Sequence, residues 1–491
     1  AVLERFELKK YLARNGNEPV ENGADSEADK ETEQHEFADL LAPESVSHRL
    51  LPLSMKFSDA ELDDLVEAGN YSVEGPSQLV LDAHSPTATV RFTRTLENGF
   101  SLDKEITFTD DSYLIDARLV ISNYSATAMD ISNRLMLGGA IKREESAGGR
   151  HYGLSGPLVM IDGQIEKTKV KKLTEAKKFV GHIHWLSLSD IYFFIAMIPG
   201  VDTVQQVELA AIPDPSADPS AEPMIELGIW TGVRDLQPHS TYRKSVRLYF
   251  GPKQFERLQK VGFDLDRIID FGTFAILARP LLKAMNAFYG FTGNYGVAII
   301  LLTIIIKLVF TPLTHFQMKS MRKMQELQPE VNKIKNKYKK EPQKANEEMM
   351  RLYKQHGANP ASGCLPMIIQ IPVFFALYSV LMQAIELRGA PFIFWLTDLS
   401  AKDPTKITPI LMGVSMFFQQ RLTPSTSDAK QKQIFMLMPI FMTFLFINFP
   451  SGLVIYWLVS NLLSLGYQGA VHLYKARKVP PERPATGKKK K

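Results

Sequence analysis

Residues 293–314 read GNYGVAIILLTIIIKLVFTPLT, an apolar stretch that contains one charged side chain, Lys307. About 20 apolar residues, at about 1.5 Å of helix per residue, span the hydrocarbon core of a bilayer. Tyr295, near one end, is an aromatic residue of the kind found at membrane interfaces. We therefore predict a membrane-spanning helix. A lysine near its centre costs about 3 kcal/mol on insertion scales, so Lys307 is expected to face a bundle interior or a water-filled cavity.

The overall composition hides two unlike halves. Residues before about 270 are polar and rich in alternating patterns, whereas 271–474 hold almost all the long apolar runs, which predicts two domains plus tails. The net charge of +4 is too small to support an argument from global electrostatic steering. One cysteine, Cys364, excludes an internal disulfide and a multi-cysteine metal site, and we interpret it as a small residue packed in a membrane helix.

Four further apolar runs follow the first one. They cover residues 363–385, 407–422, 433–449 and 452–474. Several contain proline, which membrane helices tolerate when neighbouring groups satisfy the freed carbonyls. The sequence thus predicts an α-helical membrane core of five spans over 291–475.

The charge of the loops predicts the orientation of the spans. Residues 315–360 carry eleven Lys and Arg against five acids, whereas the loop 386–406 has three basic residues. Because basic loops stay in the cytoplasm, we place 315–360 there, together with the short loop 423–432 and the basic tail 476–491. The first half of the chain then lies outside. Since the chain opens without an apolar leader, we expect that an N-terminal anchor segment was removed or trimmed.

The first half predicts an all-β sandwich over 45–250. Short alternating runs, such as YLIDARLVISN at 113–123, recur between turn signals. Residues 1–44 are predicted to be a disordered acidic linker, because they hold little that could be buried. His182 and His184 would share one face of a strand, which also suits a metal ion, but no third ligand lies nearby, and we interpret them as a polar strand face.

Two amphipathic segments flank the first span. Residues 255–274 predict a helix on the membrane surface, which leads through 275–290 into the span and defines a segment over 251–290. The loop after the span predicts a helical hairpin, with helices over 316–338 and 342–355. Its length favours a partner-binding role over a simple connector. The basic tail either binds anionic lipid or RNA phosphates or enforces the topology.

The five spans contain no Asp or Glu, so Lys307 lacks a counter-ion at its own depth. We therefore expect water to reach it. Thr303 lies one helical turn earlier on the same face. The other polar residues that could line such a pocket are Gln370, Gln419, Gln420, Ser460 and Asn461. The alternative is that the lysine stem snorkels toward the inner headgroups.

Four segments carry a resemblance to a known family. They are GNYGVAIILLTIIIKLVFTPLT, GANPASGCLPMIIQIPVFFALY (357–378), LRGAPFIFWLTDLSAKDP (387–404) and FPSGLVIYWLVSNLLS (449–464). They resemble the YidC branch of the YidC/Oxa/Alb membrane protein insertases, and the first half is similar to the periplasmic domain of Gram-negative members. The resemblance implies a five-helix core with a hydrophilic groove, open to the cytoplasm and the lipid, that inserts and folds nascent inner-membrane proteins without a nucleotide.

The resemblance also implies roles for particular residues. Lys307 matches a groove position that is commonly arginine, so the charge is kept but a bidentate contact is lost. Thr303 matches a groove residue, Gln370 is a further candidate, and Tyr456 and Trp457 match an aromatic pair that is commonly two tyrosines. The substrate-contacting slide would run along 363–385 and 433–449, where Phe374, Phe375, Phe441 and Phe444 lie.

Other functional classes remain as alternatives. The chain has no nucleophile elbow, zinc-protease helix or phosphate-binding glycine loop, so we expect no enzymatic activity, cofactor or metal. A channel or transporter with a β ectodomain, or a carbohydrate-active ectodomain on a membrane anchor, would fit parts of the pattern. The expected location is the bacterial inner membrane. The expected partners are nascent membrane proteins, membrane lipids and possible ribosome, targeting-factor and Sec translocon contacts.

Overall fold

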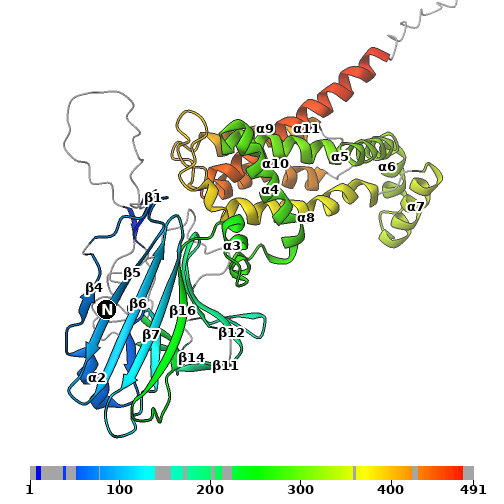
Figure 1. Cartoon of the computed structure of the whole chain (residues 1–491). Helices are drawn as coiled ribbons and strands as arrows, with labels where there is room; N and C mark the ends of the chain where they lie inside the picture. The colour runs from blue at the N-terminus through cyan, green and yellow to red at the C-terminus, as the bar shows by residue number, and fades with distance from the viewer. Residues whose placement is uncertain are drawn as a thin grey trace, which may run out of the picture. The chain divides into compact units, whose positions relative to one another are not determined.

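The computed structural model describes residues 7–12, 37–39, 51–76, 78–138, 156–169, 173, 175–200, 205–212, 224–357, 361–422 and 429–478. Contacts divide the chain into two compact units, and the boundary falls between Asp270 and Phe271. The first unit is built mainly of strands and the second of helices (Figure 1).

Two antiparallel sheets form the first unit. The larger sheet has the strand order β10-β9-β12-β13-β16-β7-β6-β5-β4, and the smaller one has the order β11-β14-β15-β8-β3. The strands of the larger sheet are β4 (Ser72–Glu74), β5 (Thr87–Thr95), β6 (Phe100–Thr109), β7 (Leu114–Asn123), β9 (Gly156–Ile161), β10 (Gln164–Lys167), β12 (Ile183–Ser189), β13 (Phe193–Pro199) and β16 (Ser240–Pro252). Those of the smaller sheet are β3 (Met55–Phe57), β8 (Asn133–Gly138), β11 (Lys177–Gly181), β14 (Gln205–Ile212) and β15 (Met224–Thr231).

The two sheets pack on each other through the apolar faces of their strands. In β6 and β7 buried and less buried residues largely alternate, as expected for strands with one covered face. Phe57 of β3 meets Phe100 of β6 edge-on, with ring centroids 5.7 Å apart, in a cluster that also holds Leu102 and Ile121. Two packed sheets confirm the predicted β-rich domain. Helices α2 (Ala60–Glu67) and α3 (Phe255–Val261) belong to this unit.

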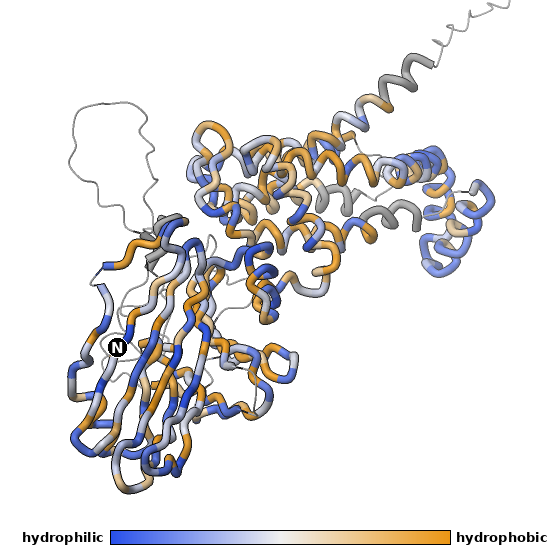
Figure 2. The backbone as a smooth tube through the Cα atoms, viewed as in Figure 1, coloured by the Kyte–Doolittle hydropathy of each residue, from blue (hydrophilic) through white to orange (hydrophobic). Residues whose placement is uncertain are grey.

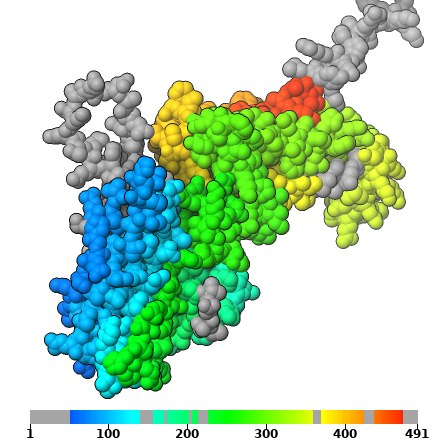
Figure 3. Space-filling view, viewed as in Figure 1, coloured from blue at the N-terminus to red at the C-terminus, as the bar shows by residue number. Residues whose placement is uncertain are grey.

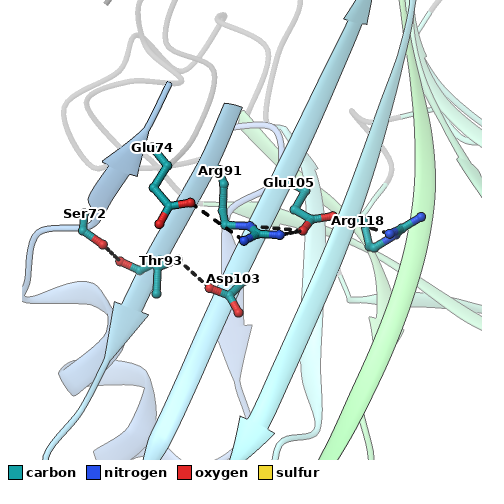
Figure 4. A network of polar contacts seen from close by, with 7 residues as sticks. All are labelled: Ser72, Glu74, Arg91, Thr93, Asp103, Glu105 and Arg118. Atoms are coloured by element: carbon teal, nitrogen blue, oxygen red, sulfur yellow. Dashed lines mark hydrogen bonds and ion pairs between the residues drawn. The ribbon is translucent and has the colours of Figure 1, made fainter. Parts of the chain in front are cut away.

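The other face of the larger sheet carries a row of charges that we call the charge ladder. Glu74, Arg91, Glu105 and Arg118 stand opposite one another on β4, β5, β6 and β7. Arg91 pairs with Glu74 at 3.8 Å and with Glu105, and Arg118 pairs with Glu105 at 3.6 Å (Figure 4). Each charge therefore has an opposite charge on the next strand, the arrangement that favours this register.

Helices make up the second unit. They are α4 (Ala275–Thr292), α5 (Tyr295–Glu326), α6 (Gln328–Lys337), α7 (Pro342–Gln355), α8 (Ala361–Gln383), α9 (Ile407–Leu422), α10 (Ala429–Phe446) and α11 (Ser451–Lys478). A helix lies at each of the five predicted spans. Among the described helices, α5 is the one long and apolar enough to cross a membrane, and shorter apolar stretches cover Ile368–Gln383 and Met436–Phe446. Figure 2 shows the apolar character of α5 and α8 beside the polar α6 and α7.

Helix α5 begins at a well-defined cap. Gly293, at a φ of 63°, ends α4, and the Asn294 side chain accepts a hydrogen bond from the Val297 amide at 3.1 Å. The Asn294 amide group also donates to the Phe392 carbonyl at 3.0 Å, which ties this turn to the segment between α8 and α9. The start of the first predicted span is thus fixed by a side-chain N-cap.

Helices α6 and α7 form the predicted hairpin, which lies at one end of the helical unit (Figure 3). The break near Glu341 is confirmed, because α7 begins at Pro342. The single helix predicted over 316–338 is wrong: α5 runs on to Glu326, and the chain breaks at Leu327, just before Pro329 opens α6. A proline is favoured in the first turn of a helix, where its missing amide hydrogen breaks no intrahelical hydrogen bond, so Pro329 suits the start of a new helix.

A further prediction was wrong. Residues 255–274 are not one helix, because α3 ends at Gly262, and Gly262, Phe263 and Asp264 all have positive φ. Two 3-10 turns follow, over Leu265–Ile268 and Gly272–Phe274. The lead-in 275–290, for which the sequence predicted no particular structure, lies in helix α4.

The linker predicted over 1–44 also contains structure. Strands β1 (Glu7–Leu12) and β2 (Phe37–Asp39) pair with each other antiparallel. Residues 13–36, most of the acidic stretch, lie outside the described residues, as does the tail from 479 on.

Candidate functional site

Polar groups join α5 to α11 along a line that we call the polar seam: the side chains of Lys307, His315, Ser464 and Tyr467 and the backbone carbonyl of Ser460. Lys307 Nζ donates a hydrogen bond to Ser464 Oγ at 3.1 Å, and Ser464 Oγ donates to the Ser460 carbonyl at 2.8 Å. Farther along, His315 Nδ1 and Tyr467 Oη lie 2.9 Å apart. The lysine charge is therefore held by a hydroxyl relay that ends on a backbone carbonyl.

Helical periodicity explains why these groups meet. His315 follows Lys307 by two turns, and Tyr467 follows Ser464 by one, so each pair shares a helix face. Neither α8, α9, α10 nor α11 contains an Asp or Glu, so no carboxylate on these helices neutralises Lys307. The side chain of Lys307 is half-buried.

Thr303 lies one turn before Lys307 but is occupied within its own helix. Its side chain is buried, and its hydroxyl donates to the Ile299 carbonyl at 2.6 Å. Its predicted place beside Lys307 on α5 follows from the helix, whereas a contact with water or substrate stays a prediction.

The aromatic pair of α11 packs against α8 and α10. Tyr456 is buried and hydrogen-bonds the Gln370 side chain. Trp457 lies between two phenylalanine rings, with centroids 5.0 Å from Phe374 and 4.9 Å from Phe446. The structure therefore brings Gln370 to Tyr456, but through a contact separate from the one at Lys307.

A third polar contact connects α11 with α9. Asn461 donates to Ser415 Oγ at 3.2 Å, and Ser415 Oγ donates to the Met412 carbonyl at 2.6 Å. Helix α11 thus takes part in all three polar contacts, with α5, α8 and α9. On α9 the Gln420 Oε1 atom is buried and has no hydrogen-bond partner among the described residues. Gln419 lies on α9 as well.

Sequence reasoning missed four of these residues. His315, Ser415, Ser464 and Tyr467 were not among the predicted groups, although Ser460, Ser464 and Tyr467 follow one another at helical spacings of four and three. That spacing marks a polar face on α11, and it was the available signal.

The four phenylalanines of the predicted slide are not equivalent. Phe441 and Phe444 of α10 are 61% and 69% exposed, and Phe375 of α8 is 47% exposed. Phe374 is half-buried against Trp457. Three of the four therefore offer apolar surface, the property that contact with lipid or with a substrate helix requires.

The segment before α9 covers the first turn of α11. The Ser451 and Gly452 amides donate to the carbonyls of Ala401 and Leu399 at 2.7 and 2.9 Å. Nearby, Asp403 accepts hydrogen bonds from Thr405 and Thr408. Burial raises the pKa of Asp403, but the hydrogen bonds from the two threonines outweigh it and hold the pKa below its usual value. This carboxylate therefore stays ionised and fixes the start of α9.

The β-rich unit has a cleft of its own on the face of the charge ladder. It encloses about 700 Å³, and its lining includes Asp116, Arg247 and Phe263. Arg247 pairs with Asp116 at 3.0 Å and lies over the Phe263 ring, 5.1 Å from its centroid. Its charged groups are thus engaged with each other.

Comparison with known proteins supports one family over most of the chain. A family model described as "60Kd inner membrane protein" matches residues 287–478, and one described as "YidC periplasmic domain" matches residues 27–284. The membrane protein insertase YidC of Geotalea daltonii is 38% identical over 391 residues, which cover 79% of this chain and 72% of that protein. The protein of the same name from Citrifermentans bemidjiense is 36% identical over 467 residues, which cover 95% of this chain and 81% of that protein.

One solved structure, an active YidC insertase crystal structure with the first transmembrane domain resolved, is 20% identical with a TM-score of 0.37 and covers 81% of this chain and 79% of that one. The family models match the two units in order, and the relatives match across both of them. The chain belongs to the YidC family of membrane protein insertases.

Proposed function

We propose that the polar seam around Lys307 is part of a hydrophilic groove through which this insertase passes the polar segments of nascent membrane proteins. The observation that carries the proposal is the state of Lys307: it is half-buried on an apolar helix, and a serine hydroxyl rather than a carboxylate holds it. A cation without a counter-charge attracts an anionic segment more strongly beside apolar walls than in bulk water.

As a member of this family the chain is an inner-membrane protein with a periplasmic domain. We propose that α5, α8, α9, α10 and α11 all cross the membrane, with the hairpin α6–α7 and the C-terminus in the cytoplasm. The support is the charge of the loops, since eleven basic residues against five acids lie over 315–360.

The groove would act by shortening the apolar path. A polar tail that enters a hydrated groove crosses only the remaining part of the hydrocarbon, and Lys307 attracts it there. The apolar part of the substrate would leave along α8 and α10, where Phe375, Phe441 and Phe444 are exposed. Gln370, Tyr456 and Trp457 would line the groove, and Thr303 would pack behind Lys307. None of these steps needs a nucleotide, a metal or a cofactor.

The hairpin would dock ribosomes or targeting factors, and the membrane unit could associate with the Sec translocon. The hairpin holds its own small core, in which Met324 and Leu327 pack with Leu352 and Tyr353. A folded, basic element outside the spans suits an acidic or RNA-containing partner.

Reconstitution of the purified chain in liposomes tests the proposal. Insertion of a single-span protein with an acidic outer tail is expected, and it should exceed insertion of the same protein with a neutral tail. Solute flux that depends on Lys307, without any insertion, would instead favour the channel reading.

A further inference from the structure

Helix α5 lacks one backbone hydrogen bond between its two contacts with α11, those of Lys307 and His315. Pro312 lies inside this helix, after Lys307 and before His315. A proline has no amide hydrogen and clashes with the preceding turn, so the hydrogen bond to the Leu308 carbonyl is missing. Sharp helix bends occur mainly at such positions.

Two threonine hydroxyls make the same turn of α5 easier to bend. Thr311 Oγ1 donates to the Lys307 carbonyl at 2.7 Å, and Thr314 Oγ1 donates to the Phe310 carbonyl at 3.0 Å. Hydroxyls that bond back to a carbonyl of the preceding turn tend to bend helices. Leu308 and Val309 are 65% and 69% exposed, so little protein packing stiffens this side of the turn.

Hydrogen bonds to α11 lie on both sides of Pro312. Before it, Lys307 is bonded to Ser464, and after it, His315 is bonded to Tyr467. The two contacts differ in their surroundings: Lys307 is half-buried, whereas His315 is exposed. Beyond His315, α5 runs without a break to Glu326, and its Met324 belongs to the core of the hairpin.

We infer that His315 and Tyr467 are positioning residues whose hydrogen bond latches the end of α5 and its hairpin onto α11 across a hinge at Pro312, and so keeps the seam closed over Lys307. When the latch opens, the part of α5 beyond Pro312 swings away, and a polar segment can reach Lys307. The role of Lys307 rests on the proposed function, but the latch and the hinge do not.

The size of the movement follows from the length of the lever. Pro312 to Glu326 spans about 21 Å of helix at about 1.5 Å per residue. A change of about 20° in the bend, typical of a kinked helix, moves the start of the hairpin by about 7 Å. Such a shift is large enough for distance measurements between spin labels.

The experiment uses the full chain in lipid nanodiscs, with Cys364→Ala and spin-labelled cysteines at the exposed residues Asn336 of α6 and Leu462 of α11. Tyr467→Phe is expected to broaden the distance distribution and shift it by up to about 7 Å. His315→Ala is expected to have the same effect. Tyr289→Phe, the same chemical change on α4, is the matched control and should leave the distribution unchanged.

Combining Tyr467→Phe with Pro312→Ala tests the hinge, and the parent distribution should return. Unchanged distributions in both Tyr467→Phe and His315→Ala would overturn the latch. Broadening that survives Pro312→Ala would overturn the hinge.

A second readout tests access to the seam. A cysteine in place of the buried Ser460 should react several-fold faster with a water-soluble maleimide when Tyr467→Phe is also present. An unchanged rate would show that opening the latch does not open the seam, and would overturn the positioning role. Insertion is measured separately: a latch that opens while Lys307 proves dispensable contradicts the proposed function but not the latch.

Discussion

Lys307 is the residue on which the proposed function depends, and its charge rather than its shape should matter. Lys307→Arg keeps the charge and is expected to retain insertion, whereas Lys307→Ala and Lys307→Glu should slow insertion of an acidic-tailed substrate by about tenfold, the effect of losing ~1.4 kcal/mol of attraction. The measurement compares insertion of one acidic-tailed and one neutral-tailed substrate. Full activity of Lys307→Ala on the acidic-tailed substrate would support the snorkelling alternative.

A second lysine makes the stability of the β-rich unit depend on pH. Lys104 is buried and donates to the Leu53 carbonyl at 2.8 Å, and burial lowers its pKa to about 7. Between that value and the ordinary pKa of about 10.4, the unfolded state binds a proton that the folded state does not, so stability rises with pH in this window. Below pH 7 Lys104 is charged in both the folded and the unfolded state, so the full free-energy cost of burying its charge lowers the stability.

Replacing Lys104 tests whether it makes the stability rise with pH. The free-energy difference between Lys104→Met and the parent should change by up to about 1.4 kcal/mol per pH unit between pH 7 and 10, with the variant relatively most favoured at pH 6. Denaturant unfolding of the β-rich unit within the whole chain provides the measurement. Lys56→Met, at an exposed lysine, is the control. A difference that stays constant with pH would contradict the prediction.

At the scale of the elements, α9 and α10 touch through a glycine. A Cβ atom at Gly413 would lie 1.9 Å from Thr443 Oγ1, so the two helices approach too closely for a side chain there. Gly413→Ala is expected to destabilise the helical unit by about 1–3 kcal/mol through overpacking. Thermal unfolding in detergent measures the loss. Gly466→Ala is the matched control, since a Cβ there meets no atom within 4 Å.

Rescue distinguishes overpacking from other causes. Adding Thr443→Ala to Gly413→Ala removes the clashing hydroxyl and should restore part of the stability. If Thr443→Ala lowers the stability further instead, the clash with the Thr443 hydroxyl is not the cause of the loss at Gly413.

The hairpin should be dispensable for folding but not for activity. Deletion of 320–355 removes the cluster of Met324, Leu327, Leu352 and Tyr353 as a whole and leaves few new apolar surfaces. The remaining helices are expected to elute as one folded species, while insertion of ribosome-bound chains is impaired. Insertion at the normal rate would reduce the hairpin to a connector.

Elements were predictable where a local signal was strong. Long apolar runs marked the positions of α5, α8, α9, α10 and α11, and Pro342 marked the start of α7. The breaks at Gly262 and Leu327 were missed because helical periodicity continues across both, and a turn there depends on how the chain folds back. Helix propensity is a weak guide to where a helix ends when tertiary contacts determine the break.

The site was predictable only in part, for a related reason. Lys307 stands out because a charge in an apolar helix is costly. Its partner Ser464 follows 157 residues later, and a single sequence does not say which face of α11 packs on α5. The aromatic pair Tyr456 and Trp457 came from family resemblance, and its contacts with Gln370 and Phe374 required the structure.

For the whole molecule, the orientation in the membrane is the testable property. In a Cys364→Ser background, a cysteine at Lys337 should react with an impermeant thiol reagent only from the cytoplasmic side. A cysteine at Val80, which is 77% exposed, should react only from the periplasmic side. The basic loop 315–360 is the physical reason for this orientation. The reverse pattern of labelling would contradict the topology.

The charge ladder has a consequence for the electric field outside the β-rich unit. Glu74, Arg91, Glu105 and Arg118 alternate in sign, so their fields cancel beyond about 8 Å, the screening length at physiological ionic strength. Acidic and basic segments therefore experience almost no net pull toward the ladder, and it leaves both free to diffuse past. A strand face whose charges sum to zero in this way holds no charged polypeptide by long-range attraction, and it stays electrically neutral toward its surroundings.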